Sequence, residues 1–234
     1  MKKIVILTGA GISAESGIST FRDSGGLWEQ YSVEDVASIE GYWRNRELVQ
    51  NFYNQRRRES IHTKPNDAHL LVAGLERYYD VTVVTQNVDN LHEKAGSSNI
   101  IHLHGELMKG TSERDPNDPR CIVDLDPEHP DIHMGDKAKD GSQLRPFIVW
   151  FGESVPKIED AAWAVGEADI LLIIGTSLNV YPAAGLINYT KTTCPIYVID
   201  PKPVSVHINR SITFIQKKAT DGMKEFYKQM GLEP

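Results

Sequence analysis

The chain has 234 residues, of which 40% are hydrophobic and 24% are charged, and its formal net charge is -7 at pH 7. This is the size of one large domain or of a domain with an insertion, and such a chain can bury a core without disulfides. The acidic balance argues against a nucleic-acid partner held by broad electrostatics. The two cysteines suit a reducing compartment, and no apolar run approaches the roughly 18 residues that cross a membrane. We therefore expect a cytoplasmic protein with no nucleic-acid or membrane partner.

The first predicted element is a short buried strand, Ile4–Leu7, which runs into the turn Gly9-x-Gly11-x-x-Ala14. The apolar run is too short for a signal peptide. A strand, a glycine turn and a helix in this order are typical of dinucleotide-binding folds: Gly9 permits the tight turn, and Gly11 lets backbone N–H groups approach a pyrophosphate. Taken alone, the turn leaves a ligand-free strand-to-helix connection equally open.

The elements that follow are predicted from apolar periodicity and from turn residues. Residues 14–28 read as a long loop after a short helix. Further strands are expected at Asp80–Thr85, Ile100–Leu103, Phe147–Phe151, Ile170–Ile174 and Ile196–Ile199. Helices are expected at 33–61, Ala68–Arg77, Asp160–Ala168, Pro182–Thr190 and Asp221–Met230.

Alternation of strands with helices predicts an α/β fold, a Rossmann-like parallel sheet with helices on both faces. Residues 109–145 are rich in Asp, Pro, Gly and Lys, which indicates an irregular inserted module. We expect it to pack with the helical insertion as a smaller second domain. The predicted division is a nucleotide-binding domain of 1–29, 78–105 and 146–234, and a small domain of 30–77 and 106–145.

The segment after the glycine turn departs from a dehydrogenase. A dehydrogenase carries an acidic residue about 20 positions on, after a second strand. Here the chain continues into Thr20-Phe21-Arg22 and then Gly25-Gly26-Leu27-Trp28. A glycine-flanked loop with Phe21 and Arg22 could close over a bound dinucleotide and exclude water. Hydride transfer is therefore disfavoured.

Four further segments occur in a fixed order: 85–89 (TQNVD), 102–105 (HLHG), 149–153 (VWFGE) and 175–177 (GTS). Together with the glycine turn and Phe21-Arg22, the ordered set resembles the sirtuin family of NAD-dependent protein lysine deacylases. The resemblance runs from residue 4 to about residue 220. It implies an enzyme that consumes NAD as a co-substrate and converts an acyl-lysine into free lysine, nicotinamide and O-acyl-ADP-ribose.

The resemblance implies catalytic roles for Asn87, Asp89 and His104. Asn87 and Asp89 would lie on the nicotinamide side, and His104 would be the general base, since an imidazole can take a proton from a ribose hydroxyl near neutral pH. His102 would point to the other face of an extended segment and is interpreted as structural. The residues expected to contact NAD are Gly9, Ala10, Gly11, Ser13, Phe21, Arg22, Trp28, Gln86, Asn87, Asp89, His104, Gly175, Thr176, Ser177, Asp200 and Ala219.

Two segments are expected to bind the acyl-lysine substrate. Val149–Glu153 would be an edge strand that pairs with the peptide backbone; an ordinary core strand is the alternative. Tyr53 and Arg56 share a helix face and resemble the Tyr-x-x-Arg pair of the class III branch, which removes negatively charged acyl groups. A guanidinium can bind a carboxylate bidentately. A solvated basic face is the alternative, because two more arginines follow. The expected substrate-binding residues are Tyr53, Arg56, Val149, Phe151, Gly152 and Glu153.

The inserted module departs from the family, whose members mostly hold a structural zinc with four cysteines. Only Cys121 lies in that interval, and its spacing to His129 and His133 matches no standard zinc site. We expect no bound metal. Packing and loop hydrogen bonds would hold the module instead, with a small core listed as Leu107, Ile122, Val123 and Leu125.

The function expected from these motifs is removal of succinyl or malonyl groups, and more weakly of acetyl groups, from protein lysines. The alternatives are a mono-ADP-ribosyltransferase or NAD hydrolase, which needs no peptide-pairing strand, and a non-catalytic NAD-binding module. The partners would be acyl-lysine proteins or peptides, and the chain would be a monomer.

Overall fold

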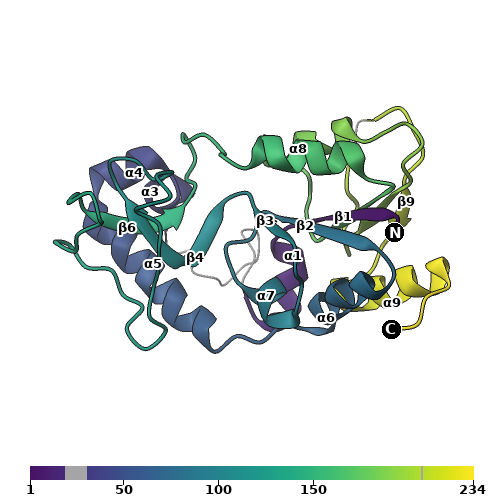
Figure 1. Ribbon diagram of the computed structural model, residues 1–234, viewed down its shortest axis with the longest axis horizontal. Coiled ribbons are helices and arrows are strands. Elements are labelled where there is room, and N and C mark those ends of the chain that lie inside the picture. Colours follow the sequence, from purple (N-terminus) through teal and green to yellow (C-terminus); the bar gives the residue numbers. More distant parts are fainter. Residues whose placement is uncertain (19–30, 207) are drawn as a thin grey trace.

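Residues 1–18, 31–206 and 208–234 are described by a computed structural model with two β-sheets and the helices that cover them (Figure 1). The larger sheet has six strands in the order β3-β2-β1-β7-β8-β9, and every pairing in it is parallel. Along this sheet the chain order is 3-2-1-4-5-6, the order of the dinucleotide-binding fold. The predicted fold class is confirmed. The strands are β1 (Lys3–Thr8), β2 (Asp80–Thr85), β3 (Ile100–His102), β7 (Ile170–Ile174), β8 (Ile196–Ile199) and β9 (Thr213–Ile215).

Helices cover both faces of this sheet, as Figure 1 shows. Successive side chains of a strand point to opposite faces. Ile4 and Ile6 of β1 therefore join one apolar cluster and Val5 and Leu7 the other. The first face is covered by α6 (Asp67–Gly74) and α9 (Ala219–Met230), and the second by α8 (Ile158–Glu167) and η3 (Ala183–Tyr189). Short elements complete this layer: α1 (Ala10–Ser13), η1 (Ala14–Ser16), η2 (Leu75–Arg77) and α7 (Leu91–Ala95).

The second sheet is antiparallel and has three strands in the order β5-β4-β6. Three helices pack against it around the buried side chains of Tyr42, Phe52 and Trp150. These elements lie together at one end of the molecule (Figure 1). They are α3 (Val33–Val36), α4 (Ile39–Arg44), α5 (Arg46–Ile61), β4 (Gly105–Ser112), β5 (Val123–Asp124) and β6 (Leu144–Ile148).

The helical character expected over 33–61 is confirmed, and the segment is divided into three helices. Ser38 begins α4 by accepting a hydrogen bond from the N–H of Gly41 at 2.9 Å. Asn45 begins α5 by accepting from the N–H of Leu48 at 3.1 Å. Serine and asparagine are favoured at helix N-termini for this reason.

The edge strand expected over Val149–Glu153 is wrong in its extent. Strand β6 ends at Ile148, and only Phe151 makes an isolated parallel bridge, with Ser38. Gly152 has φ +91°, a left-handed conformation that turns the chain, and the N–H of Glu153 bonds back to the carbonyl of Trp150 at 3.0 Å.

The inserted module is more regular than expected and is held differently. Strand β4 extends to Ser112, and Ile122, Val123 and Leu125 are only half-buried, so the expected apolar core is wrong except at Leu107. Strand β9, only three residues long, was not expected. Among the described residues, no helix combines the length and apolar character needed to cross a membrane.

Candidate functional site

The glycine turn lies where β1 and β7 diverge in chain order, the point at which such sheets bind ligands. The N–H of Gly9 donates to Ile174 O at 3.0 Å, and the N–H of Gly11 donates to Gly175 O at 2.9 Å. A Cβ on Gly11 would lie 2.6 Å from the Cα of Gly175, so only glycine permits this approach. The two predicted nucleotide-binding segments are therefore one structural unit.

A buried polar cluster lies directly beneath this turn. Ser13 Oγ donates to Asp89 Oδ2 at 3.0 Å, and Asn87 Nδ2 donates both to Ser13 Oγ and to Gly9 O at 3.1 Å. The N–H of Asn87 donates to Thr85 Oγ1 at 3.0 Å. Within the described part of the chain, Asn87 Oδ1 has no hydrogen-bond partner. This oxygen is therefore held in place and available to a ligand.

Burial raises the pKa of Asp89, although hydrogen bonds from Leu91 N–H and from Ser13 act in the opposite direction. The side chain is only 8% exposed. The carboxyl group thus lies in a poorly solvated place where a bound amide N–H would be a favourable partner.

Two buried histidines support the same cluster. His92 Nε2 lies 3.1 Å from Thr8 Oγ1, and His69 Nε2 lies 3.5 Å from Ser13 Oγ. Burial lowers the pKa of His69 to about 4 and that of His92 to about 3, so both rings are neutral near pH 7. They serve as hydrogen-bonding groups rather than as charges.

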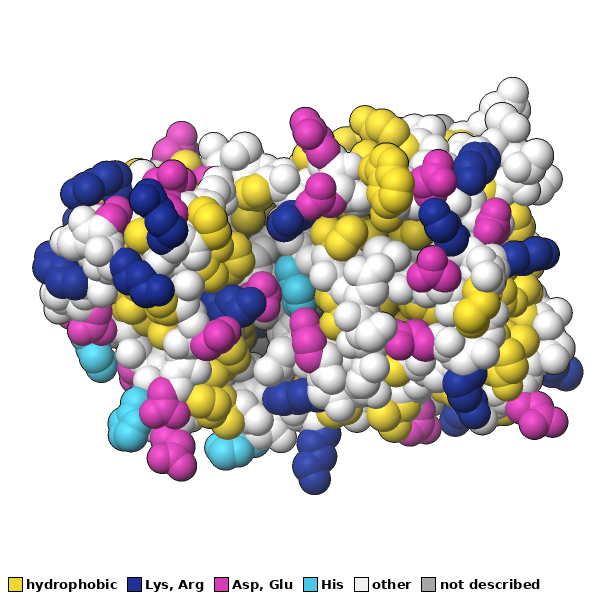
Figure 2. Space-filling model, in the orientation of Figure 1, with side chains coloured by type: hydrophobic (Ala, Val, Ile, Leu, Met, Phe, Trp, Pro, Cys, Tyr) yellow, Lys and Arg dark blue, Asp and Glu magenta, His cyan; other side chains and the backbone are white. Residues whose placement is uncertain are grey.

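His104 has the geometry of a general base. Its Nδ1 lies 2.9 Å from the carbonyl oxygen of Gln86, which can only accept, so Nδ1 carries the hydrogen. Nε2 is then the acceptor nitrogen, and it has no partner among the residues that the structure describes. Burial lowers the pKa of His104, which favours the neutral ring. Figure 2 shows that the molecule is hollowed between its two parts, with acidic, basic and histidine side chains around the hollow.

Tyr53 and Arg56 lie on α5, with Tyr53 beside the buried indole of Trp150 and Arg56 beside the ring of Phe52. Trp150 Nε1 donates to the hydroxyl oxygen of Tyr53 at 3.0 Å. Burial raises the pKa of Tyr53 to about 12, so the phenol keeps its proton, which is free to be donated. Burial lowers the pKa of Arg56, while interactions with Tyr53, Glu59 and Asp89 act in the opposite direction.

The segment expected to bind the peptide follows β6. The N–H of Val149 donates to His104 O at 2.9 Å, which joins this segment to the base. The N–H of Phe151 donates to Ala37 O at 2.9 Å, and its side chain is 50% exposed. Glu153 makes two hydrogen bonds to the fully buried Arg145, at 2.7 and 3.0 Å. Glu153 thus fixes the turn, whereas Gly152 is exposed.

The far end of the predicted nucleotide site is built from the ends of β7 and β8. Gln86 Nε2 donates to Thr176 Oγ1 at 3.1 Å, which ties two predicted ribose-side residues together. Ser177 is half-buried beside them. Asp200 lines a cavity of about 210 Å³ with Lys202 and Phe214. Ala219 is buried at the start of α9.

Comparison with known proteins gives the relationship. The family model described as "Sir2 family" matches residues 9–182. The chain belongs to the Sir2 family. An "NAD-dependent protein deacylase" of Bacteroides thetaiotaomicron is 61% identical over 225 residues, 96% of each chain. A protein of the same name from Helicobacter pylori is 50% identical over 230 residues, 98% of each chain.

Two solved Sir2 structures have the same fold. The structure of a Sir2 homologue–NAD complex has a TM-score of 0.85 at 37% identity, and covers 98% of this chain and 90% of its own. An ADP-ribose complex of a Sir2 homologue mutant has a TM-score of 0.86 at 37% identity, and covers 100% of this chain and 95% of its own. Those proteins bind their nucleotides on the fold described above.

Three residues that the Sir2 resemblance assigns to the NAD site, Phe21, Arg22 and Trp28, lie outside the described residues. Ala10 begins α1 and is half-buried. The remaining expected NAD-contact residues all lie at the carboxyl ends of the parallel strands or on the elements that follow them.

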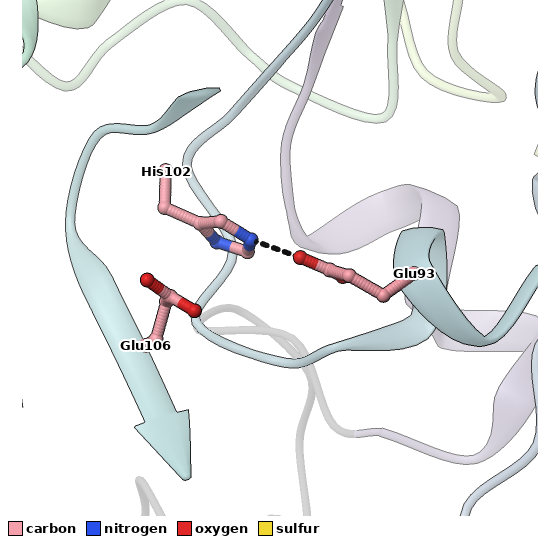
Figure 3. A group of neighbouring side chains, drawn as sticks. All are labelled: Glu93, His102 and Glu106. Atoms are coloured by element: carbon pink, nitrogen blue, oxygen red, sulfur yellow. Dashed lines mark hydrogen bonds and ion pairs between the residues drawn. The ribbon is translucent and has the colours of Figure 1, made fainter. Parts of the chain in front are cut away.

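The residues considered above as possible zinc ligands, Cys121, His129 and His133, do not form a cluster in the described part of this Sir2 chain. Cys121 is buried, with Sγ 3.8 Å from Asp118 Oδ2, and His129 pairs with Asp126 on the surface. Within the described ranges, the one group with metal-like spacing is Glu93, His102 and Glu106, whose ligand atoms lie within 4.8 Å of one another (Figure 3).

Sequence reasoning missed four buried side chains that hold the site or the inserted module in place: His69, His92, Arg57 and Arg145. The motif spacing indicated the residues expected to face the ligand, but these four make their hydrogen bonds to other residues of the chain. Arg57 was grouped with a solvated basic face, yet it is fully buried and donates to Pro130 O at 2.7 Å. The one signal in the sequence was Asn66, which begins helix α6 three residues before His69.

Proposed function

We propose that the protein is an NAD-dependent protein lysine deacylase with a preference for acidic acyl groups. Acyl-lysine, NAD and water would give free lysine, nicotinamide and O-acyl-ADP-ribose. The observation that carries the proposal is the cluster of Asn87 and Asp89 at the glycine turn, with His104 bonded to Gln86 O, one residue before Asn87, and its Nε2 available as an acceptor. The names of the Bacteroides and Helicobacter relatives support it.

The residues present fit NAD at this place. Gly9 and Gly11 let the turn approach Gly175 and Thr176 closely, and α1 begins directly after Gly9, where partial positive charge favours a pyrophosphate. Asn87 Oδ1 has no hydrogen-bond partner among the described residues, while Nδ2 of the same amide is bonded to Gly9 O. The cavity beside Asp200 has the size for part of a nucleoside. NAD would supply the bond to nicotinamide that is broken.

The chain's own groups would act in a defined order. Asp89 would bind the carboxamide N–H of the nicotinamide, and Asn87 would orient the ribose or a water molecule. His104 would then take a proton from a ribose hydroxyl at Nε2 while its Nδ1–H stays bonded to Gln86 O. The exposed backbone around Gly152, next to Phe151, would meet the peptide.

The preference for acidic acyl groups rests on Tyr53 and Arg56. An acetyl group offers nothing for a guanidinium or a phenol to bind, whereas a succinyl or malonyl group ends in a carboxylate. Tyr53 is oriented by Trp150, and the half-buried position of Arg56 strengthens its interaction with a carboxylate.

The reaction is tested by mass spectrometry of the products formed from NAD and acetyl-, malonyl-, succinyl- and glutaryl-lysine peptides. O-acyl-ADP-ribose in step with free lysine is expected. Nicotinamide release that is equally fast without peptide would instead indicate an NAD hydrolase, and ADP-ribosylated protein a transferase. NAD binding without nicotinamide release under any peptide would indicate a non-catalytic module. His104→Ala should abolish O-acyl-ADP-ribose formation, because no other base would take the ribose proton.

The acyl preference is tested with Arg56→Met, using Arg58→Met as the matched control. Both changes remove one positive charge from α5, but Arg58 is exposed and pairs with Asp131. Arg56→Met should lower kcat/KM for the succinyl peptide by about ten- to hundredfold, the effect of one charged hydrogen bond or two. Hydrolysis of the acetyl peptide should change little. A wild-type enzyme that prefers acetyl-lysine would contradict the assignment.

A further inference from the structure

The loop that carries Asn87 and Asp89 is held by its backbone carbonyls. His104 Nδ1 bonds to Gln86 O, His102 Nδ1 lies 3.2 Å from Asn87 O, and Leu107 N–H donates to Val88 O at 2.8 Å. Three consecutive carbonyls are thus bound by one short stretch, 102–107. Two of the three donors are imidazole rings, and only His104 has a proposed part in the chemistry.

His102 meets an acceptor at each ring nitrogen. Nδ1 faces the carbonyl of Asn87, and Nε2 lies 2.7 Å from Glu93 Oε1 (Figure 3). A carbonyl and a carboxylate can only accept, so both hydrogen bonds form together when both nitrogens carry hydrogen. Burial by itself would lower the pKa of His102, but the Glu93 carboxylate outweighs burial and raises it. The geometry therefore requires an imidazolium, the opposite of the neutral ring at His104.

The same three side chains, Glu93, His102 and Glu106, have the spacing of a metal site, but their contacts are already made. Glu93 holds His102 Nε2, and Lys109 Nζ lies 2.9 Å from Glu106 Oε2. A metal ion would have to displace both partners. The ion pair is the better description of this cluster.

We propose that His102 is a positioning residue, which fixes the nicotinamide-side loop by donating Nδ1–H to Asn87 O while Glu93 holds its other nitrogen. The inference rests on the proposed function, since it assigns His102 an effect on the nicotinamide-side groups. The side-chain amide of Asn87 and the carboxylate of Asp89 belong to the short loop whose backbone this bond restrains. A small rotation of the Asn87 carbonyl would move both groups relative to the ligand.

The test separates the two nitrogens of His102 by substitution. Asparagine places its Nδ2 donor near the position of histidine Nδ1, so His102→Asn can keep the bond to Asn87 O and loses Glu93. Glutamine places its donor near Nε2, so His102→Gln can keep Glu93 and loses Asn87 O. His102→Leu loses both. The readouts are nicotinamide release, KM for NAD, KM for the acyl peptide and the thermal midpoint.

Loss of the Asn87 bond should lower the rate of nicotinamide release about tenfold in His102→Leu and His102→Gln, with KM for the peptide unchanged. His102→Asn should retain most of the wild-type rate. Equal losses in the Asn and Gln variants, or losses that follow the thermal midpoint and raise both KM values, would overturn the proposal. If wild type shows no deacylation, the proposed function fails instead, and the variants' NAD affinity still reports on the loop.

A pH profile of Glu93→Gln gives the second readout. His102 makes both of its hydrogen bonds below the pKa of its ring, and it loses one of them as the pH rises through that pKa. In Glu93→Gln the new amide can donate to Nε2 of the neutral ring, which leaves Nδ1–H on Asn87 O, so the decline of nicotinamide release at high pH should be lost. The other ionisable groups near the ring are Glu106 and Lys109 on β4, Asp89, and His92 on α7. A profile that does not move would overturn the proposed charge state.

Discussion

His104 must be neutral to act as a base, and its surroundings favour that form. Its Nδ1–H is bonded to Gln86 O, and burial lowers the pKa of the ring below the ordinary 6.5. His102, two residues earlier, is held in the opposite charge state by Glu93. Opposed environments of this kind are how one fold separates acid and base groups.

The rate of acyl transfer should therefore rise with pH along an acidic limb whose midpoint lies below pH 6.5. Because the folded pKa of His104 is lowered, the neutral base persists to lower pH than a free histidine would allow. The measurement is O-acyl-ADP-ribose formation at saturating NAD and peptide across pH 5 to 9. An acidic limb centred above pH 6.5 would contradict the role of burial at His104.

Acid should also weaken the fold through His69 and His92, which are held neutral with pKa values of about 4 and about 3 against an ordinary 6.5. Below pH 6.5 the unfolded chain takes up these protons and the folded chain does not. The free energy of unfolding should then fall by about 1.4 kcal/mol per pH unit for each histidine. Denaturant unfolding at pH 7 and pH 5 measures this, and His92→Gln should make the fall shallower. An unchanged fall would show that His92 titrates normally.

Helix α5 holds the inserted module with polar side chains. Asn54 Nδ2 donates to Ile132 O at 2.9 Å, and Asn54 Oδ1 accepts from Ile132 N–H at 2.9 Å, as a neighbouring strand would. Arg57 bonds to Asn54 and to Pro130 O. The sequence could not reveal this, because Asn54 and Arg57 resemble the polar residues of any exposed helix until the loop that they bind is placed.

Replacing Asn54 with alanine should lower the free energy of unfolding by about 2–4 kcal/mol, because it leaves a buried N–H and a buried C=O without partners. Gln55→Ala is the matched control, since Gln55 bonds only to Glu59 on the exposed side, and should change stability by less than about 0.5 kcal/mol. Thermal and denaturant unfolding, each with and without a zinc chelator, measure both. A large fall caused by the chelator would show that a metal, rather than α5, holds the module.

Element boundaries were predictable where the pattern was apolar and short. Asp80–Thr85, Ile170–Ile174 and Ile196–Ile199 have the predicted bounds, because branched apolar runs end at turn residues. The breaks at Ser38 and Asn45 were missed, because no proline marks them. The ligand-facing positions could be predicted from ordered motifs, whereas the hydrogen bonds behind them join residues as far as 84 positions apart, as Thr8 and His92 are.

At the scale of the whole molecule, the layers of helix and sheet depend on close approaches. A Cβ on Gly222 of α9 would lie 2.1 Å from Cγ2 of Ile199 on β8, so this helix lies against the sheet only with glycine there. The parallel sheet with helices on both faces followed from the alternation of elements, but the strand order, strand β9 and the spacing between layers did not. The division into two domains stays a prediction.

Gly222→Ala should therefore destabilise the protein by about 1–3 kcal/mol, since α9 must move off β8 or strain its side chains. Gly166→Ala on α8 is the matched control on the opposite face. There the nearest atom to a new Cβ is Tyr189 O at 3.7 Å, an ordinary contact. Alanine's higher helix propensity should stabilise that variant by up to about 1 kcal/mol. Equal effects of the two changes would show that α9 tolerates displacement.

The backbone around His104 is bonded to both of the regions proposed to bind ligands. Its carbonyl accepts from Val149 at the start of the peptide segment, and its ring and neighbours hold the carbonyls of residues 86–88. Ordering of either region restrains the same few peptide units. The affinities for peptide and dinucleotide should then be thermodynamically coupled, so that whichever ligand arrives first makes the second bind more tightly, by the same factor in either order.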